Sequence, residues 1–132
     1  MIKDVAVKEI MSKQVITVQD ADRLSKLEDI WKTNPIHHLV VLKGEMVVGV
    51  VSKIDMLKAY NKMVESTDLK TMSMLPVKDI MTKNPLTVES EDTVGLVADI
   101  MLANKFHSLP VVDDGELAGI VTSHDLIKYG FR

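Results

Sequence analysis

Two short phrases of this sequence each place a hydroxyl side chain three residues before a carboxylate. They are GVVSKIDML, with Ser52 and Asp55, and GIVTSHDL, with Thr122 and Asp125. In both, a β-branched apolar run precedes the pair, which predicts a strand that leads into a helix. The amides at a helix N-terminus favour phosphate, and a carboxylate one turn later suits the hydroxyl groups of a sugar. The spacing therefore favours a nucleotide-binding site.

The same spacing also has a purely structural interpretation. A hydroxyl-x-x-carboxylate pattern at a helix start matches the capping box, in which both side chains satisfy exposed backbone amides. Gly49 and Gly119, three residues before the hydroxyls, mark a bulge or a close backbone approach in the preceding strand. Capping and ligand binding are compatible, because a cap side chain can change partners when a ligand arrives. The sequence leaves both interpretations open.

No catalytic or metal-binding set accompanies these pairs. The sequence contains no P-loop, GxGxxG, GxSxG or HExxH pattern and no cysteine. His37 and His38 are consecutive, and consecutive side chains of an extended strand point to opposite faces. We therefore expect a binding protein rather than an enzyme, with no catalytic residue, no metal site and no required cofactor.

The composition narrows the class of protein further. The chain has 132 residues, of which 46% are hydrophobic and 27% are charged, as in a globular domain. With a net charge of −3 it lacks the basic face that binds nucleic acid, so nucleic acid is not an expected partner. The absence of cysteine, of a long apolar stretch and of a signal-peptide pattern predicts a cytoplasmic protein that does not associate with membranes.

Most of the chain is an internal repeat. Val7–Ala59 aligns with Val77–Tyr129 without a gap, and identical pairs recur along the alignment. We expect two copies, residues 1–60 and 77–132, joined by a linker of residues 61–76. In each copy a brief strand (VITV or PLTV), an apolar stripe at helical spacing and a hairpin pattern predict the order β-α-β-β-α. The stripes are Leu24, Leu27, Ile30 and Trp31, then Val94, Val97, Met101 and Leu102. The expected fold is α/β, with two such copies related by a pseudo-two-fold axis.

The ordered set of motifs resembles the CBS domain, named after cystathionine β-synthase. Each copy reads V-K-[ED]-I-M-[ST]-K, x-x-T-V, a helix, H-x-L-x-V, G-[VI]-V-[ST]-x-x-D and a closing helix. Two copies in register are similar to a stand-alone Bateman module. This resemblance implies sheet-to-sheet packing of the copies, a homodimer and an unknown regulated protein. It also implies clefts for an adenosyl ligand such as AMP, ADP, ATP or S-adenosylmethionine.

The resemblance implies that each cleft combines the strand-to-helix phrase of one copy with the x-x-T-V threonine of the other. The first cleft would contain Ile36, His37, His38, Ser52, Ile54, Asp55 and Thr87. The second would contain Thr17, Phe106, His107, Ser108, Thr122, His124 and Asp125. In both, the aspartate is implied to bind ribose, the hydroxyl to bind phosphate or ribose oxygens, and the threonine to border the base.

The two implied clefts are not equivalent. Ile54 is apolar where His124 can donate a hydrogen bond, so the second cleft is favoured. Neither cleft has an arginine for a triphosphate, which favours AMP or an adenosyl compound of low charge. The competing hypothesis is a ligand-free interaction module in which the pairs are only caps and the repeat serves dimerisation. Thr17 and Thr87 favour binding, because capping requires neither.

Overall fold

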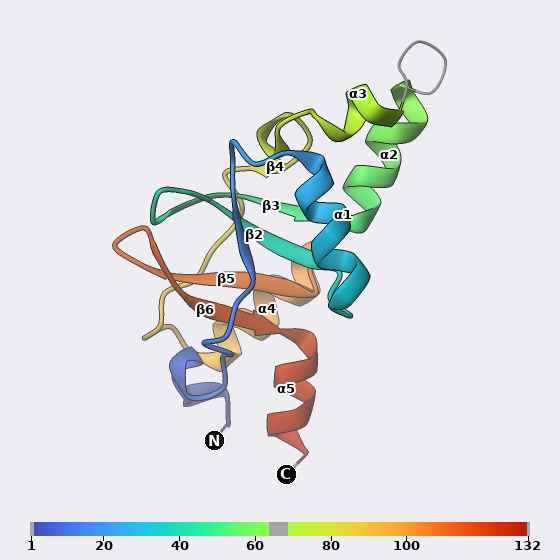
Figure 1. Ribbon diagram of the computed structural model, residues 1–132. Coiled ribbons are helices and arrows are strands. Elements are labelled where there is room, and N and C mark those ends of the chain that lie inside the picture. The colour runs from blue at the N-terminus through green and yellow to red at the C-terminus, as the bar shows by residue number, and fades with distance from the viewer. Residues whose placement is uncertain (1, 64–68, 132) are drawn as a thin grey trace. The chain divides into compact units, whose positions relative to one another are not determined.

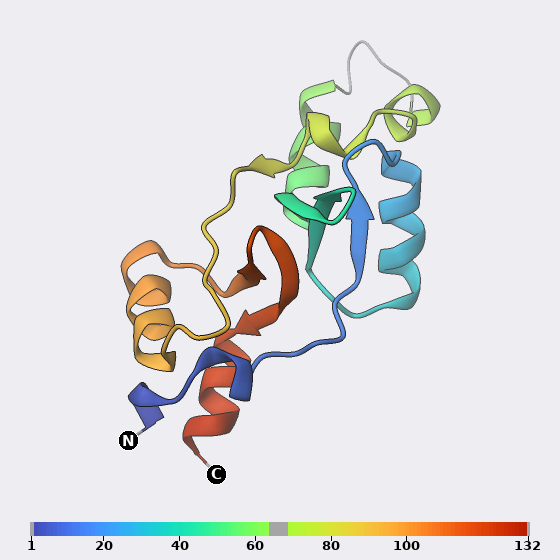
Figure 2. The ribbon, with the colours of Figure 1, turned by 90° about the vertical axis from the view of Figure 1, so that its left-hand side faces the viewer.

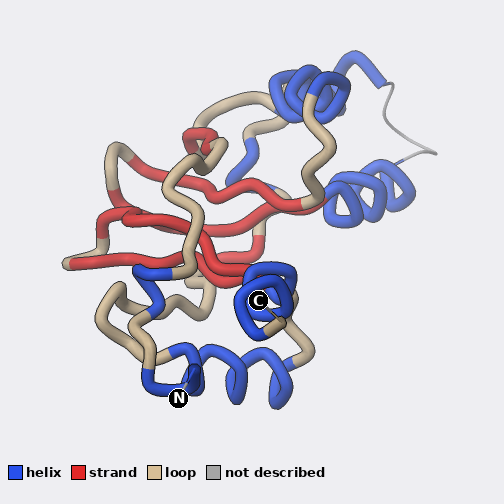
Figure 3. The backbone as a smooth tube through the Cα atoms, turned by 90° about the horizontal axis from the view of Figure 1, so that it is seen from below, coloured by secondary structure: helices blue, strands red, loops and turns tan. Residues whose placement is uncertain are grey.

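The computed structural model describes residues 2–63 and 69–131 and divides the chain into two compact units. The first unit is Ile16–Pro85, and the second combines Met1–Val15 with Leu86–Arg132. Both mix helices with strands, as the α/β expectation requires (Figures 1 and 3). Among the described residues, no helix has the length and apolar character needed to cross a membrane.

The first unit is built around a hairpin of two antiparallel strands. Its elements are β1 (Thr17–Gln19), α1 (Leu24–Thr33), β2 (His38–Lys43), β3 (Met46–Ser52), α2 (Lys53–Met63), α3 (Leu69–Ser73), the 3-10 turn η3 (Val77–Asp79) and β4 (Thr82–Lys83). Strand β2 pairs with β1 in parallel and with β3 in antiparallel register. Strand β4 adds two residues on the other edge of β3. The segment expected to be a linker thus contains a helix, α3, which contacts both α1 and α2.

The second unit repeats this plan with small differences. Its elements are the 3-10 turns η1 (Ile2–Asp4) and η2 (Val7–Glu9), then α4 (Val94–Asn104), β5 (Ser108–Asp113), β6 (Glu116–Thr122) and α5 (Ser123–Gly130). Strands β5 and β6 form the hairpin. The strand expected in PLTV is reduced to one parallel bridge, between Val88 and Val111. That prediction was therefore too long for the second copy.

Each unit takes its opening turn from the other sequence repeat. The backbone N–H of Val77, from the second copy, donates to the carbonyl of Asp22 at 2.7 Å in the first unit. At the matching place in the second unit, the N–H of Val7 donates to the carbonyl of Asp92, also at 2.7 Å. Figures 1 and 2 show the blue N-terminal segment beside α4 and α5, and the olive segment that contains β4 beside α2 and β3. The chain therefore exchanges two segments between its repeats: residues 2–15 belong to the second unit, and residues 77–85, the start of the second copy, belong to the first unit.

The exchanged valines complete the two hydrophobic cores. Val77 and Val7 are both 0% exposed, and each belongs to the buried cluster of its unit. The first cluster contains Val18, Leu24, Leu27, Trp31, Leu39, Val41, Val51 and Val77. The second contains Val7, Val88, Val97, Met101, Leu109, Val111 and Val121. The apolar stripes on α1 and α4 are thus confirmed as core, except that Leu102 is exposed.

Both glycines of the repeated phrase lie where another chain segment approaches closely. A Cβ atom on Gly119 would lie 2.6 Å from the carbonyl oxygen of Ser12 and 2.8 Å from Met11 Sδ. A Cβ atom on Gly49 would lie 2.9 Å from the carbonyl oxygen of Thr82. In both hairpins the strand register also shifts beside the glycine, as in a β-bulge. Both of the predicted roles, bulge and close approach, are therefore confirmed.

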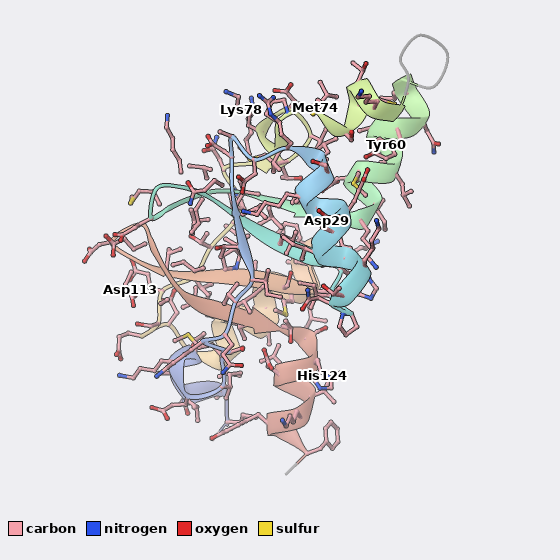
Figure 4. The ribbon with its side chains drawn as sticks, viewed as in Figure 1. Asp29, Tyr60, Met74, Lys78, Asp113 and His124 are labelled. Atoms are coloured by element: carbon pink, nitrogen blue, oxygen red, sulfur yellow. The ribbon has the colours of Figure 1, made fainter. Side chains whose placement is uncertain are left out.

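Helix α2 is fastened to α1 by a hydrogen bond between side chains. The hydroxyl of Tyr60 on α2 donates to the carboxylate of Glu28 on α1; Figure 4 labels Tyr60. Burial, together with the hydrogen bond and the charge of Glu28, raises the pKa of Tyr60 above its ordinary value. At the matching positions the second unit has Gly130 and Ala98, so this bond is specific to the first unit.

The glycine contacts predict unequal costs for an added methyl group. We expect Gly119→Ala to lower the free energy of unfolding by about 2 kcal/mol, because a backbone oxygen must move. Gly49→Ala should cost less, about 1.5 kcal/mol: the backbone oxygen of Thr82 lies at 2.9 Å rather than 2.6 Å, and the closer atom, Met81 Sδ, belongs to a flexible side chain. Urea unfolding measures both values. Gly130→Ala is the control, because its nearest foreign atom is 3.7 Å away. Equal costs at Gly119 and Gly130 would contradict this account.

The Tyr60–Glu28 bond predicts an alkaline loss of stability. Because the folded-state pKa of Tyr60 is raised, its contribution is complete below the unfolded-chain value of about 10 and disappears as the pH rises through the folded-state value. Tyr60→Phe should cost about 0.5–1 kcal/mol near neutral pH, the modest range for a partly exposed bond, and remove this part of the alkaline loss. Chemical unfolding across alkaline pH tests this. Tyr129→Phe, which leaves the pair intact, should keep the loss.

Candidate functional site

The predicted hydroxyl–carboxylate pair of the first unit lies where β3 ends and α2 begins. Ser52 is the last residue of β3, and Asp55 lies in the first turn of α2. The N–H of Asp55 donates to Ser52 Oγ at 3.0 Å, and the N–H of Ser52 donates to Asp55 Oδ2 at 2.9 Å. The two side chains thus cap the helix reciprocally.

The second unit builds the same junction between β6 and α5. The N–H of Asp125 donates to Thr122 Oγ1 at 3.1 Å, and the N–H of Thr122 donates to Asp125 Oδ2 at 2.9 Å. The capping interpretation is therefore confirmed in both repeats. In each box the cap uses one carboxylate oxygen, and a carboxylate accepts through two oxygens, so acceptor capacity remains. All four side chains are half-buried and within reach of solvent.

The residues that precede the first hairpin strand lie directly against each junction. In the first unit His38 is the register partner of Ser52, and the N–H of Lys53 donates to the carbonyl of His37 at 3.2 Å. Ile36, half-buried, precedes them and packs against the hydrophobic cluster. The side chains of His37 and His38 are exposed. The structure therefore brings this part of the first predicted cleft together.

The same arrangement holds in the second unit. Ser108 is the register partner of Thr122, and the N–H of Ser123 donates to the carbonyl of His107 at 2.9 Å. The side chains of His107 and of Phe106 before it are exposed. In both units the carbonyl of the histidine therefore anchors the first amide of the helix, while its imidazole faces solvent. The cap uses the third amide, so these bonds leave the second amide of each helix as a donor for a ligand.

The residue that carries this second amide differs between the units. It is Ile54 in the first unit, with 62% of its surface exposed, and His124 in the second, also exposed. Figure 4 labels His124 on α5. An imidazole beside the free amide offers a second hydrogen-bond donor, whereas isoleucine offers only apolar surface.

The two threonines lie on short extended segments. Thr17 begins β1 and pairs with Val40, and Thr87 immediately precedes the bridged residue Val88. Thr17 belongs to the same unit as Ser52, and Thr87 to the unit that holds Thr122. Because the predicted clefts pair each threonine with the phrase of the other copy, that pairing stays a prediction.

The first unit also contains a pocket that the sequence did not reveal. Its volume is about 470 Å³, and it is lined by Asp55, Lys58, Ala59, Lys62, Leu75, Asp79 and Ile80. The first four residues share one face of α2, a spacing that is visible in the sequence. Of the last three, Asp79 and Ile80 come from the exchanged segment, and Leu75 lies two residues before η3. Only the structure reveals that this segment returns to the first unit, which is why the pocket was missed.

The family model of the CBS domain matches residues 7–62 and again 77–132. Inosine-5'-monophosphate dehydrogenase of Korarchaeum cryptofilum is 36% identical over 86% of this chain, which spans 22% of that enzyme. The chain spans less than half the length of the first three curated relatives it matches.

Two similar solved structures contain adenosyl compounds. CBSX2 in complex with AMP is 27% identical, with a TM-score of 0.82 over 95% of both chains. The CBS domain pair of protein MJ0100, in complex with 5'-methylthioadenosine and S-adenosyl-L-methionine, is 28% identical, with a TM-score of 0.77 over 96% of this chain and 95% of that one. The double family match, the repeated junctions and these folds agree. The chain belongs to the CBS domain family and carries two copies of that domain in tandem.

Proposed function

We propose that the chain is a regulatory module that binds an adenosyl ligand at its strand-to-helix junctions. The observation that carries this proposal is the reciprocal Ser/Thr–Asp junction, built in the same way in both units. Family members 27–28% identical to this chain have solved complexes with AMP or with methylthioadenosine and S-adenosylmethionine. The proposed ligands are AMP, ADP, ATP, S-adenosylmethionine or a relative of these.

The chemistry of the junction suits a nucleoside. The hydroxyl groups of a ribose donate hydrogen bonds, and the remaining acceptor positions of Asp55 or Asp125 receive them as charge-assisted bonds. The second amide of the helix and the hydroxyl of Ser52 or Thr122 offer donors to a phosphate oxygen. From the resemblance to the family, we propose that Thr17 and Thr87 border the base.

Regulation requires that the ligand distinguish two states of the protein. A bound adenosyl compound shifts an equilibrium only by the difference between its affinities for those states. We propose that a protein partner, or a further part of a longer chain, reads this shift. No catalytic step is proposed for the two domains.

A second candidate function is self-association without a ligand. Helix α2 exposes Ile54 and Leu57, at 62% and 57%, and α5 exposes Ile127 at 61%. Exposed apolar side chains on helices favour contact with another surface, and the resemblance implies a homodimer. In this alternative the hydroxyl–carboxylate pairs are only caps.

A ligand screen separates the two candidates. We expect AMP or another adenosyl compound to raise the melting temperature, because a ligand at 100 times its dissociation constant adds about 2.7 kcal/mol to stability. Differential scanning fluorimetry with AMP, ADP, ATP, S-adenosylmethionine, 5'-methylthioadenosine and NAD tests this. If none of them shifts the melting temperature while the protein sediments as a dimer, the ligand-free alternative is supported and the proposal fails.

The difference between Ile54 and His124 predicts which junction binds AMP more tightly. We expect Asp125→Ala to weaken AMP binding about tenfold or more, because it removes charge-assisted bonds, and Asp55→Ala to weaken it less. Isothermal titration calorimetry well below the melting temperature measures both. Thr93→Ala is the matched control: it removes the cap of α4, where Thr93 Oγ1 accepts the N–H of Leu96 at 3.2 Å, without touching either junction. An equal or larger loss from Asp55→Ala would refute this ranking.

A further inference from the structure

The pocket in the first unit adjoins the junction through a shared residue. Asp55 caps α2 with one carboxylate oxygen and also lines the pocket. From there the pocket follows one face of α2, past Lys58 and Ala59, to Lys62. Its volume of about 470 Å³ lies within the range of small-molecule sites. A ligand held at Asp55 can therefore extend into this pocket.

The charges around the pocket are balanced rather than uniformly positive. Lys58 and Lys62 stand on the α2 side, and Asp55 and Asp79 supply two carboxylates. Within the part of the chain that the structure describes, Lys58, Lys62 and Asp79 take part in no ion pair. A phosphate would meet the lysines but would also face two like charges. A group that carries both an ammonium and a carboxylate can satisfy both kinds of side chain.

The apolar part of the lining gives such a group room for a short aliphatic chain. Ala59, Leu75 and Ile80 supply this surface, and all three are half-buried. The room depends on the small side chain of Ala59. At the matching position the second unit has Tyr129, although Lys128, Glu9 and Ile10 preserve the rest of the pattern. The two units therefore differ where a ligand would extend along the closing helix.

We propose that the pocket formed by Asp55, Lys58, Ala59, Lys62, Leu75, Asp79 and Ile80 receives the α-amino acid tail of an adenosyl ligand. Lys58 and Lys62 bind the carboxylate of the tail, Asp79 binds its ammonium group, and Asp55 holds the ribose. This inference rests on the proposed function, since it assigns a ligand class to one of the two junctions. The first unit then selects adenosyl amino acids, and the second unit, which has His124, binds AMP.

Three probes that differ only near the tail test this assignment. 5'-Methylthioadenosine lacks the tail, S-adenosylhomocysteine carries it, and S-adenosylmethionine adds a sulfonium charge. The fluorescence of Trp31, the single tryptophan, reports on the first unit, because Trp31 lies in the same cluster as Tyr60 of α2. We expect both tail-bearing compounds to bind the first unit about tenfold more tightly than methylthioadenosine, the gain of about one charge-assisted bond.

Variants of residues on α2 test whether the preference for tail-bearing compounds arises in this pocket. Lys58→Ala combined with Lys62→Ala should remove the tenfold preference and leave methylthioadenosine binding unchanged. Ala59→Tyr, which introduces the residue of the second unit, should do the same. Lys128→Ala is matched to Lys58→Ala and should change neither affinity. Circular dichroism and the melting temperature establish that each variant is folded, and the exposed lysine variants test the assignment if Ala59→Tyr does not fold.

The outcomes separate this inference from the function on which it rests. If methylthioadenosine binds and the tail adds nothing, the pocket assignment is wrong and the proposed function stands. If the double lysine variant weakens AMP as much as S-adenosylhomocysteine, the pocket is a general anion site and the amino acid assignment is wrong. If no adenosyl compound binds, the proposed function fails and this inference fails with it.

Discussion

Each unit depends on one exchanged valine and the backbone hydrogen bond beside it. Val77 and Val7 are fully buried, and the amide of each donates at 2.7 Å to a carbonyl just before the first helix of its unit. A buried amide that lost this partner would carry a large desolvation cost, and the valine would leave a cavity in the core. The buried valine and its hydrogen bond therefore fix the path of the residues that follow. These residues approach the hairpin so closely that a Cβ atom at Gly49 or Gly119 would lie less than 3.0 Å from a backbone oxygen.

The site is a consequence of this arrangement. The hairpin strand ends at the hydroxyl residue, the closing helix begins at the next one, and the capping box fixes the carboxylate within reach of solvent. The exchanged segment then supplies the far wall of the pocket through Asp79 and Ile80. In the first unit one sequence motif thus has three roles: Val77 fills the core, Met81 covers Gly49, and Asp79 and Ile80 between them line the pocket.

The sequence predicted those features that depend on local order. The hairpins, the apolar stripes and both capping boxes follow from residue type and spacing, and the structure agrees with them. The sequence did not predict the pocket. The repeat aligns Asp79 with Glu9 and gives no sign that each of these residues belongs to the unit of the other copy. The PLTV strand also shrank to one bridge at Val88, since pairing depends on the neighbouring strand rather than on β-propensity alone.

The exchange of opening segments has a consequence for how such a chain can arise. A single repeat contains the opening segment that its own unit does not use, so one copy alone leaves a core without its valine. Two separate chains of one copy each would complete their cores only by swapping segments. The extent of that association would depend on the protein concentration in the cell. Duplication on one chain makes that swap intramolecular, at an effective concentration in about the millimolar range. Once tethered, the two copies are free to diverge, as Ala59 and Tyr129 have done.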